Sequence, residues 1–186
     1  DGAAKHYKVV FGIILGSGCG GGLVINKKIV SGANGLGGEW SLNQMPLKDV
    51  KLNIDEDNKF DFSHRIEGYL SGKSIEKNFK LLFKKKLSAK DIFSKYRDND
   101  SNAVKFINIY KKNLARSLVI IITTIDPDAI VFGGGVSNEI DFLDELKTMS
   151  AKYLNEKNLK TVFLKPIYGD ASGVRGAALL GRQNLI

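Results

Sequence analysis

The chain is poor in the residues that form disulfides and transition-metal sites. Its 186 residues include one cysteine, Cys19, and two histidines, His6 and His64. A lone cysteine excludes an intramolecular disulfide, and these residues form no Cys/His cluster with the spacing of zinc ligands. We therefore expect no metal site, and a reducing, cytoplasmic compartment.

Long apolar runs are also missing. The longest, Leu118 to Ile122, is far shorter than the ~20 residues of a membrane helix, so no membrane partner is expected. The net charge of +8 could indicate a nucleic-acid partner. The lysines are scattered, however, apart from Lys27–Lys28 and Lys84–Lys86, which favours a solvated basic surface. The chain opens on Asp1 without a signal pattern, so we expect a piece of a longer protein.

Strand and helix patterns alternate along the chain. Apolar runs flanking a glycine-rich turn predict a strand, a loop and a strand. The segments in order are strands over Lys8–Leu15 and Gly22–Ile25, helices from Ser74 and after a Ser88 cap, a long helix over Ser101–Ile125, a strand over Ala129–Phe132, a helix from Asn138 or Glu139 to about Leu154, a strand over Thr161–Leu164 and a helix capped by Asp170. The polar stretch Asn43–Phe62 predicts an exposed, mobile excursion. This order predicts an α/β domain.

Two of the strands run into glycines. Gly16–Gly22 lies between two strands, so it is neither a Rossmann fingerprint, which opens a helix, nor a P-loop, which needs Gly-Lys-Ser/Thr. Glycines let successive N–H groups approach a phosphate, and Ser17 adds a hydroxyl donor; the alternative is a flexible hairpin tip. Gly133–Gly135 lies between a strand and a helix, where backbone can pass under a flat ring or bind an anion. The alternative is a tight turn.

Four ordered segments resemble the sugar kinases of the ROK (repressor, open reading frame, kinase) family. They are LGSGCGGGLVINKKIVSGANGLGGEW from Leu15, IEGYLSGKS from Ile66, IDPDAIVFGGGVSN from Ile125 and YGDASGVRGAALLG from Tyr168. The resemblance covers nearly the whole chain except Asn43–Ser63. It implies transfer of the ATP γ-phosphoryl to the 6-hydroxyl of a hexose or N-acetylhexosamine, with N-acetylglucosamine favoured.

The resemblance also implies the fold: an actin-like ATPase domain of the RNase H-like α/β class, with a mixed sheet and helices on its faces. Residues 1–186 would be the carboxy-terminal, nucleotide- and sugar-binding domain of a two-domain kinase. The amino-terminal domain, which in the family carries the catalytic aspartate, would precede Asp1. We therefore expect no catalytic residue in this chain, and no activity from these residues alone.

Site residues follow from the same resemblance. The nucleotide contacts fall on Gly16, Ser17, Gly18, Cys19, Gly20, Gly21, Gly22, Leu23, Gly133, Gly134 and Gly135. The sugar contacts fall on Glu39 and Glu67, where a carboxylate could accept two hydrogen bonds from adjacent hydroxyls; the alternative is a pair of solvated glutamates. ATP would carry Mg²⁺. The partners would be the sugar, ATP and the protein's own amino-terminal domain, and a homodimer is left open.

The chain departs from the family around the sugar site. Relatives carry Gly-His two residues after the glutamate, and the histidine binds zinc with three cysteines; here Glu39 is followed by Trp40-Ser41-Leu42, and no cysteine accompanies His64. We expect no zinc. Loss of the metal weakens the kinase assignment and leaves two alternatives, a sugar-sensing transcriptional regulator of the same family and a degenerate sugar-binding protein.

Overall fold

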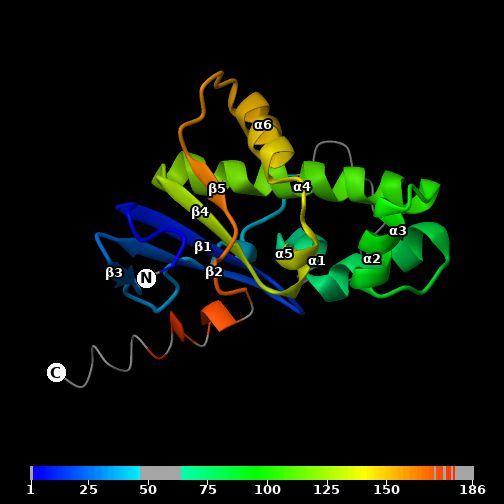
Figure 1. The fold of residues 1–186 in the computed structure, drawn as a ribbon, viewed down its shortest axis with the longest axis horizontal. Helices are drawn as coiled ribbons and strands as arrows, with labels where there is room; N and C mark the ends of the chain where they lie inside the picture. The colour runs from blue at the N-terminus through cyan, green and yellow to red at the C-terminus, as the bar shows by residue number, and fades with distance from the viewer. Residues whose placement is uncertain (1, 47–63, 170, 174, 177, 179–186) are drawn as a thin grey trace.

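A mixed five-stranded sheet forms the centre of the chain. The computed structural model describes residues 2–46, 64–169, 171–173, 175, 176 and 178. The strand order is β3-β2-β1-β4-β5, with β2 antiparallel to β1 and β3, and β4 parallel to β1 and β5 (Figure 1). The strands are β1 (Val9–Leu15), β2 (Cys19–Ile25), β3 (Lys28–Val30), β4 (Ala129–Gly133) and β5 (Val162–Leu164).

Helices connect and cover these strands. They are the 3₁₀ helix η1 (Trp40–Leu42), α1 (Glu67–Leu70), α2 (Gly72–Phe83), α3 (Ala89–Arg97), α4 (Ser101–Ile125), α5 (Gly135–Glu139) and α6 (Leu143–Leu154). The predicted Ser88 cap of α3 is confirmed, because its hydroxyl accepts the Asp91 N–H. The long helix α4 has the predicted bounds and ends at Asp126, which is left-handed and precedes Pro127. No helix in the described part of the chain could cross a membrane.

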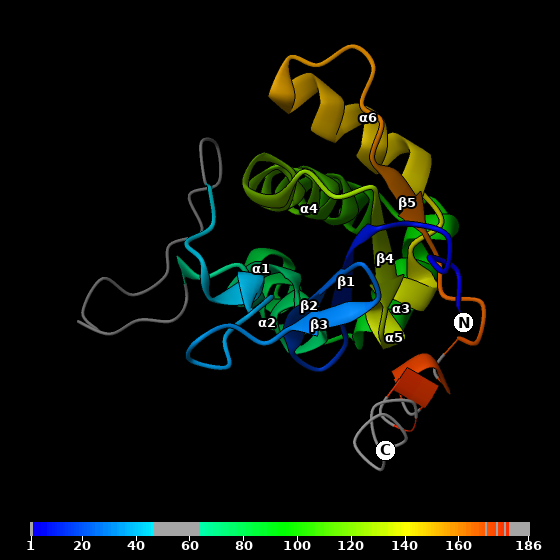
Figure 2. The ribbon, with the colours of Figure 1, turned by 90° about the vertical axis from the view of Figure 1, so that its left-hand side faces the viewer.

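One face of the sheet is buried under helices. Phe11, Ile13 and Leu15 alternate along β1 and are at most 1% exposed, whereas Ile14 between them is 50% exposed. The helix α4 lies along the buried face, and α6 lies beside α4 (Figure 2). The carboxyl half of α4 is apolar because it lies between the sheet and α6.

Polar contacts fix the helices to one another. Lys111 on α4 is almost fully buried, and its ammonium donates to Glu145 on α6 at 2.6 Å and to the Tyr96 hydroxyl on α3 at 2.8 Å. The Phe142 ring lies 4.5 Å from the same ammonium. Arg97 on α3 pairs with Glu139 on α5 at 2.8 Å. These contacts join α4 to both α3 and α6, and α3 to α5.

The structure corrects several sequence predictions. The helix expected from Asn138 or Glu139 is two helices, because α5 already begins at Gly135 and the buried Ile140 interrupts it with extended backbone. The short helices η1 and α1 were not predicted. Within Asn43–Phe62 the expectation of exposure is wrong for Met45, which is 6% exposed; residues 47–63 lie outside the described residues. Asp170 lies outside them too, and residues 171–173 are helical as expected.

Candidate phosphate and sugar site

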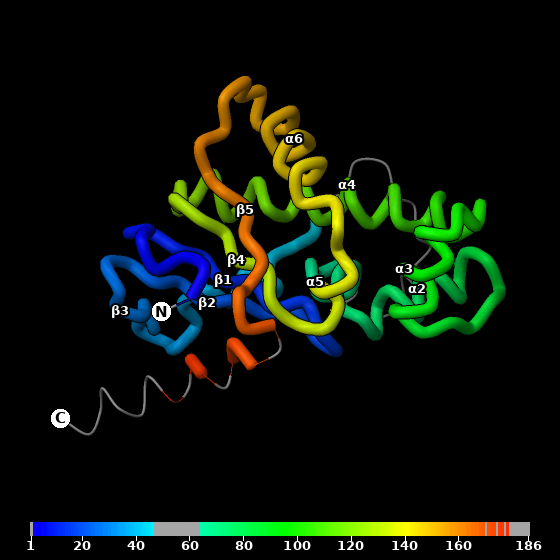
Figure 3. Tube along the Cα trace, viewed as in Figure 1, coloured from blue at the N-terminus to red at the C-terminus, as the bar shows by residue number. Residues whose placement is uncertain are grey.

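The first glycine segment is a tight turn followed by a strand. The loop predicted over Gly16–Gly22 is limited to Gly16–Gly18, closed by a Gly16 N–H that donates to the Gly18 carbonyl at 2.9 Å. The remaining predicted residues, Cys19 to Leu23, belong to β2 and pair with β1. Cys19, Gly20 and Gly21 were assigned to the loop because glycines disfavour strands, but antiparallel pairing with β1 overrides that preference and starts the strand three residues before the predicted Gly22. We call Gly16–Gly18 the phosphate turn; it forms the tip of the β1–β2 hairpin (Figure 3). Ser17 and Gly18 are exposed there.

The second glycine segment lies directly beside the phosphate turn. Gly133 pairs with Ile14 in the parallel β1–β4 ladder, so both strands end at the same edge of the sheet. Gly134 follows with φ +90°, and a Cβ there would lie 2.5 Å from the Leu15 carbonyl oxygen. Only glycine allows this close approach. The structure therefore brings together the two segments that the sequence had singled out separately.

The glycines fall into two groups according to what a side chain would meet. At Gly21 a Cβ would lie 2.7 Å from the Trp40 ring and 2.8 Å from Phe11, so packing within the chain requires glycine there. At Gly16, Gly20, Gly22 and Gly135 a Cβ would meet nothing within 4 Å. The fold itself does not explain these four glycines. Gly16, Gly20 and Gly135 lie where β1 ends and α5 begins, so a side chain at any of them would enter open space there; Gly22 pairs with Gly12 farther along the sheet.

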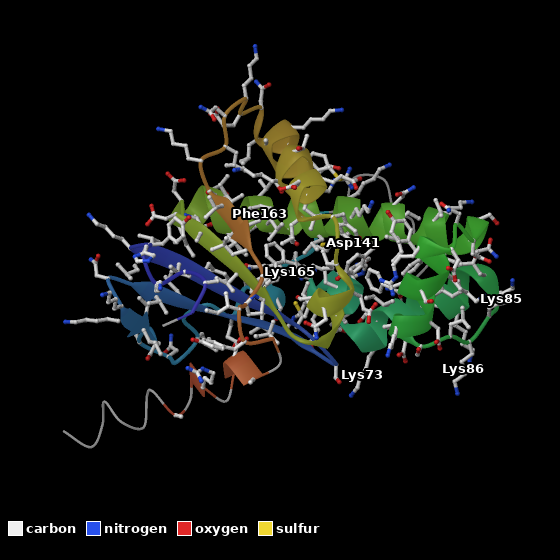
Figure 4. All side chains as sticks on the ribbon, viewed as in Figure 1. Lys73, Lys85, Lys86, Asp141, Phe163 and Lys165 are labelled. Atoms are coloured by element: carbon white, nitrogen blue, oxygen red, sulfur yellow. The ribbon has the colours of Figure 1, made fainter. Side chains whose placement is uncertain are left out.

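The start of α2 anchors the phosphate turn. The Gly72 N–H donates to the Gly16 carbonyl at 2.7 Å, and a Cβ on Gly72 would lie 3.0 Å from that oxygen. The next residue, Lys73, projects from the start of α2 beside the hairpin tip, whereas Lys85 and Lys86 project far from it (Figure 4). Sequence reasoning missed Gly72, although it lies in the quoted segment IEGYLSGKS. The Ser71-Gly72 pair before a helical pattern was the available signal.

Glu67 lies at the phosphate turn. It is the first residue of α1, and one of its carboxylate oxygens accepts the Cys19 N–H at 3.2 Å. The same oxygen lies 2.9 Å from where a Gly18 Cβ would be. The interaction uses part of the hydrogen-bonding capacity of the carboxylate, which can accept further bonds.

Glu39 lies immediately before η1 with an exposed side chain. The two residues that follow it, Trp40 and Ser41, are buried and donate hydrogen bonds to the backbone of β2. Sequence reasoning had treated them only as departures from a family motif. A tryptophan in a glycine-rich stretch was a signal for a packing anchor.

The thiol of Cys19, directly after the phosphate turn, has a raised pKa. The pKa of Cys19 is raised from an ordinary 9.0 to about 12, mainly by burial and then by the negative charges of Glu67 and Glu39, in that order of size. The thiol is therefore neutral at physiological pH. At that pH it is therefore a poor nucleophile, because the thiolate is the reactive form.

No group of three His, Cys, Asp or Glu side chains able to hold a metal occurs among the residues that the structure describes. His64 is exposed, and its carbonyl accepts the Met45 N–H at 2.7 Å. The expected absence of zinc remains a prediction for elemental analysis.

Comparison with protein families shows which family the chain belongs to. The model of the ROK family matches residues 1–184. This chain belongs to the ROK family. Among curated ROK relatives, the N-acetyl-D-glucosamine kinase of Histophilus somni is 38% identical over 182 residues. The alignment covers 95% of this chain and 59% of that protein, so the chain spans about three fifths of its relative.

Solved structures confirm the fold. A ROK family glucokinase from Streptomyces griseus, in complex with glucose and AMPPNP, matches with a TM-score of 0.79 at 24% identity, over 97% of this chain and 62% of that one. A ROK family transcriptional regulator, homologous to the MLC protein of E. coli, matches with a TM-score of 0.67 at 20% identity, over 89% of this chain and 43% of that one. The predicted actin-like ATPase fold with a mixed α/β sheet is thereby confirmed.

Proposed function

We propose that this chain is the carboxy-terminal domain of an ATP-dependent sugar kinase that phosphorylates the 6-hydroxyl of a hexose or N-acetylhexosamine, with N-acetylglucosamine foremost. The observation that carries the proposal is the meeting of two glycine segments at the adjacent ends of β1 and β4, with the Glu67 carboxylate and the segment that follows Glu39 both bonded to the backbone directly after the turn. The similarity to kinases named for N-acetylglucosamine supports this choice of sugar.

The phosphate turn would hold the phosphates of ATP. Gly16 and Gly20 leave open space around the turn, and Ser17 exposes a hydroxyl there. Backbone N–H groups and a hydroxyl suit an anion because each donates a hydrogen bond to it. Fixed donors would stabilise the charge on the transferring phosphoryl, and Mg²⁺ on the nucleotide would neutralise part of it.

The second segment would contact the adenosine. Gly135 starts α5 with open space where a Cβ would be, beside the Gly134 that lies against β1. A flat ring could lie over this backbone at a distance that a side chain would prevent. Gly133 and Gly134 would then act as supports, because contacts within the chain restrict them.

The two carboxylates would bind sugar hydroxyls. Glu67 is held by the Cys19 N–H and retains further acceptor capacity, and Glu39 is exposed on an anchored backbone. A carboxylate that accepts from hydroxyls forms charge-assisted hydrogen bonds, which are stronger than neutral ones. The base that removes the proton of the sugar hydroxyl would come from an amino-terminal domain preceding this chain, which is why these residues alone should be inactive.

The test uses the full-length protein with ATP and a panel of N-acetylglucosamine, N-acetylmannosamine, glucose and fructose. Release of ADP is followed, and sugar affinity is measured by calorimetry. Replacing Glu39 by Gln should weaken sugar binding about tenfold to a hundredfold, from the loss of about 1.5–3 kcal/mol of charge-assisted hydrogen bonding. ATP affinity should be unchanged. If no sugar in the panel is phosphorylated while sugars still bind, the chain belongs to a sensor or regulator instead.

A further inference from the structure

Three side-chain hydrogen bonds converge on the backbone at the start of β2. The Ser41 hydroxyl donates to the Cys19 carbonyl at 2.6 Å, and the Trp40 indole N–H donates to the Gly20 carbonyl at 2.8 Å. The Glu67 carboxylate accepts the Cys19 N–H at 3.2 Å. The backbone directly after the phosphate turn is therefore bonded to both segments that carry the proposed sugar-binding carboxylates.

These bonds take the place of a neighbouring strand. Among the described residues β3 pairs with β2 only at Leu23–Ile25, so the stretch Cys19–Gly22 has no strand on that side. Backbone groups in such a position need other partners. Ser41 and Glu67 satisfy both polar groups of the Cys19 backbone. The start of β2 is thus bonded by side chains from the two segments that carry the proposed sugar-binding carboxylates.

The same contacts fix the backbone of Glu39 on both sides. Before it, Gly38 has φ +93° and lies so close to β2 that a Cβ there would be 2.6 Å from the Gly22 Cα. After it, Trp40 and Ser41 are 4% and 1% exposed. The Trp40 ring packs against Gly21, where a Cβ would lie 2.7 Å from it. The Glu39 backbone therefore cannot move without breaking the packing against β2.

We infer that Ser41 and Trp40 are positioning residues, which hold the sugar-binding carboxylate Glu39 in fixed register with the phosphate turn. The inference rests on the proposed function and deepens it. Transfer of a phosphoryl group depends on the placement of acceptor and donor, and a displacement of about 1 Å can lower the rate a hundredfold. A hydrogen-bonded anchor of this kind would maintain that placement without a metal ion. The phosphate turn itself has a separate anchor at Gly72, so loss of Ser41 should affect the sugar more than ATP.

The test replaces Ser41 by Ala in the full-length protein, with Ser117→Ala as the matched control. Ser117 is also fully buried and donates to a backbone carbonyl at 2.7 Å, but it lies within α4. Trp40→Phe, which removes only the indole N–H and part of the ring, is a second variant in case Ser41→Ala does not fold. For each we would measure kcat, the KM of the sugar, the Kd of ATP without sugar, and the thermal midpoint.

We expect Ser41→Ala and Trp40→Phe to lower kcat/KM for the sugar tenfold to a hundredfold, with the Kd of ATP within about threefold of wild type. Ser117→Ala should lower the thermal midpoint about as much as Ser41→Ala does, and should leave kcat/KM for the sugar within about threefold of wild type. If both site variants keep the wild-type kcat/KM in an active enzyme, the inference is wrong and the proposed function stands. If the wild-type enzyme phosphorylates no sugar in the panel, the proposed function fails and the inference fails with it.

Discussion

The contact between the two glycine segments makes a sharp prediction about Gly134 and its neighbour Gly135. Gly134 has φ +90° and ψ 161°, a backbone conformation that is nearly confined to glycine. A Cβ at this position would also lie 2.5 Å from the Leu15 carbonyl oxygen, so β1 and β4 would have to separate. Gly135 is the first residue of α5, and a Cβ there would meet nothing within 4 Å. The substitutions Gly134→Ala and Gly135→Ala therefore add the same methyl group in opposite surroundings.

The magnitudes follow from these two surroundings. The backbone strain at Gly134 should cost about 1–3 kcal/mol, and the forced separation from Leu15 a further ~1–3 kcal/mol. The sum of about 2–6 kcal/mol is a large part of the ~5–15 kcal/mol by which domains are stable. At Gly135 the added methyl should change the free energy of unfolding by less than about 1 kcal/mol, since alanine suits a helix at least as well as glycine.

Urea denaturation of the two variants and the wild type, followed by circular dichroism, measures this difference. With a denaturant slope of ~2 kcal/mol per molar, Gly134→Ala should lower the urea midpoint by about 1 M or more, and Gly135→Ala should hardly shift it. The folded Gly135→Ala variant should instead bind ATP about tenfold more weakly than wild type, because the added methyl would occupy the space proposed for adenosine. Equal midpoints for Gly134→Ala and wild type would refute the close contact between β4 and β1.

Further predictions concern the thiol, the buried lysine and the metal. Because the pKa of Cys19 is raised to about 12 from an ordinary 9.0, iodoacetamide at pH 8 should alkylate native Cys19 on the order of a thousandfold more slowly than a small thiol; a rate near that of glutathione would contradict this. The raised pKa also contributes stability that is present below pH 9.0 and is lost as the pH rises toward 12, so Cys19→Ala should lose less stability than wild type over that range. Lys111→Met should destabilise the protein by about 1–3 kcal/mol in urea, because the bonds to Glu145 and Tyr96 are lost; an unchanged midpoint would show that the α3–α4–α6 contact contributes nothing. Elemental analysis should find no stoichiometric zinc, because the described residues contain no group of three possible ligands. One zinc per chain would contradict this prediction.

The sequence by itself determined the class of fold and the two glycine segments. The apolar runs and the Ser88 cap are local signals, and α3, α4 and β4, which they predict, occur in the structure, whereas the helix expected from Asn138 or Glu139 is divided at Ile140. Local signals of this kind work because periodicity and capping depend on residues within one element. The four matching segments, likewise read without a structure, predicted the family.

Tertiary structure decided the rest, because it concerns contacts between residues far apart in the chain. Pairing with β1 turned most of the expected loop into β2, although its glycines alone disfavour a strand. The neighbourhood of Gly134 and Leu15 exists only because β4 lies parallel to β1, a pairing across more than a hundred residues. Ser41 and Trp40 looked like losses from a motif in the sequence, yet in the fold they bond to the backbone next to the phosphate turn. A hydrogen bond between distant segments leaves no periodic pattern, so only the folded chain could show it.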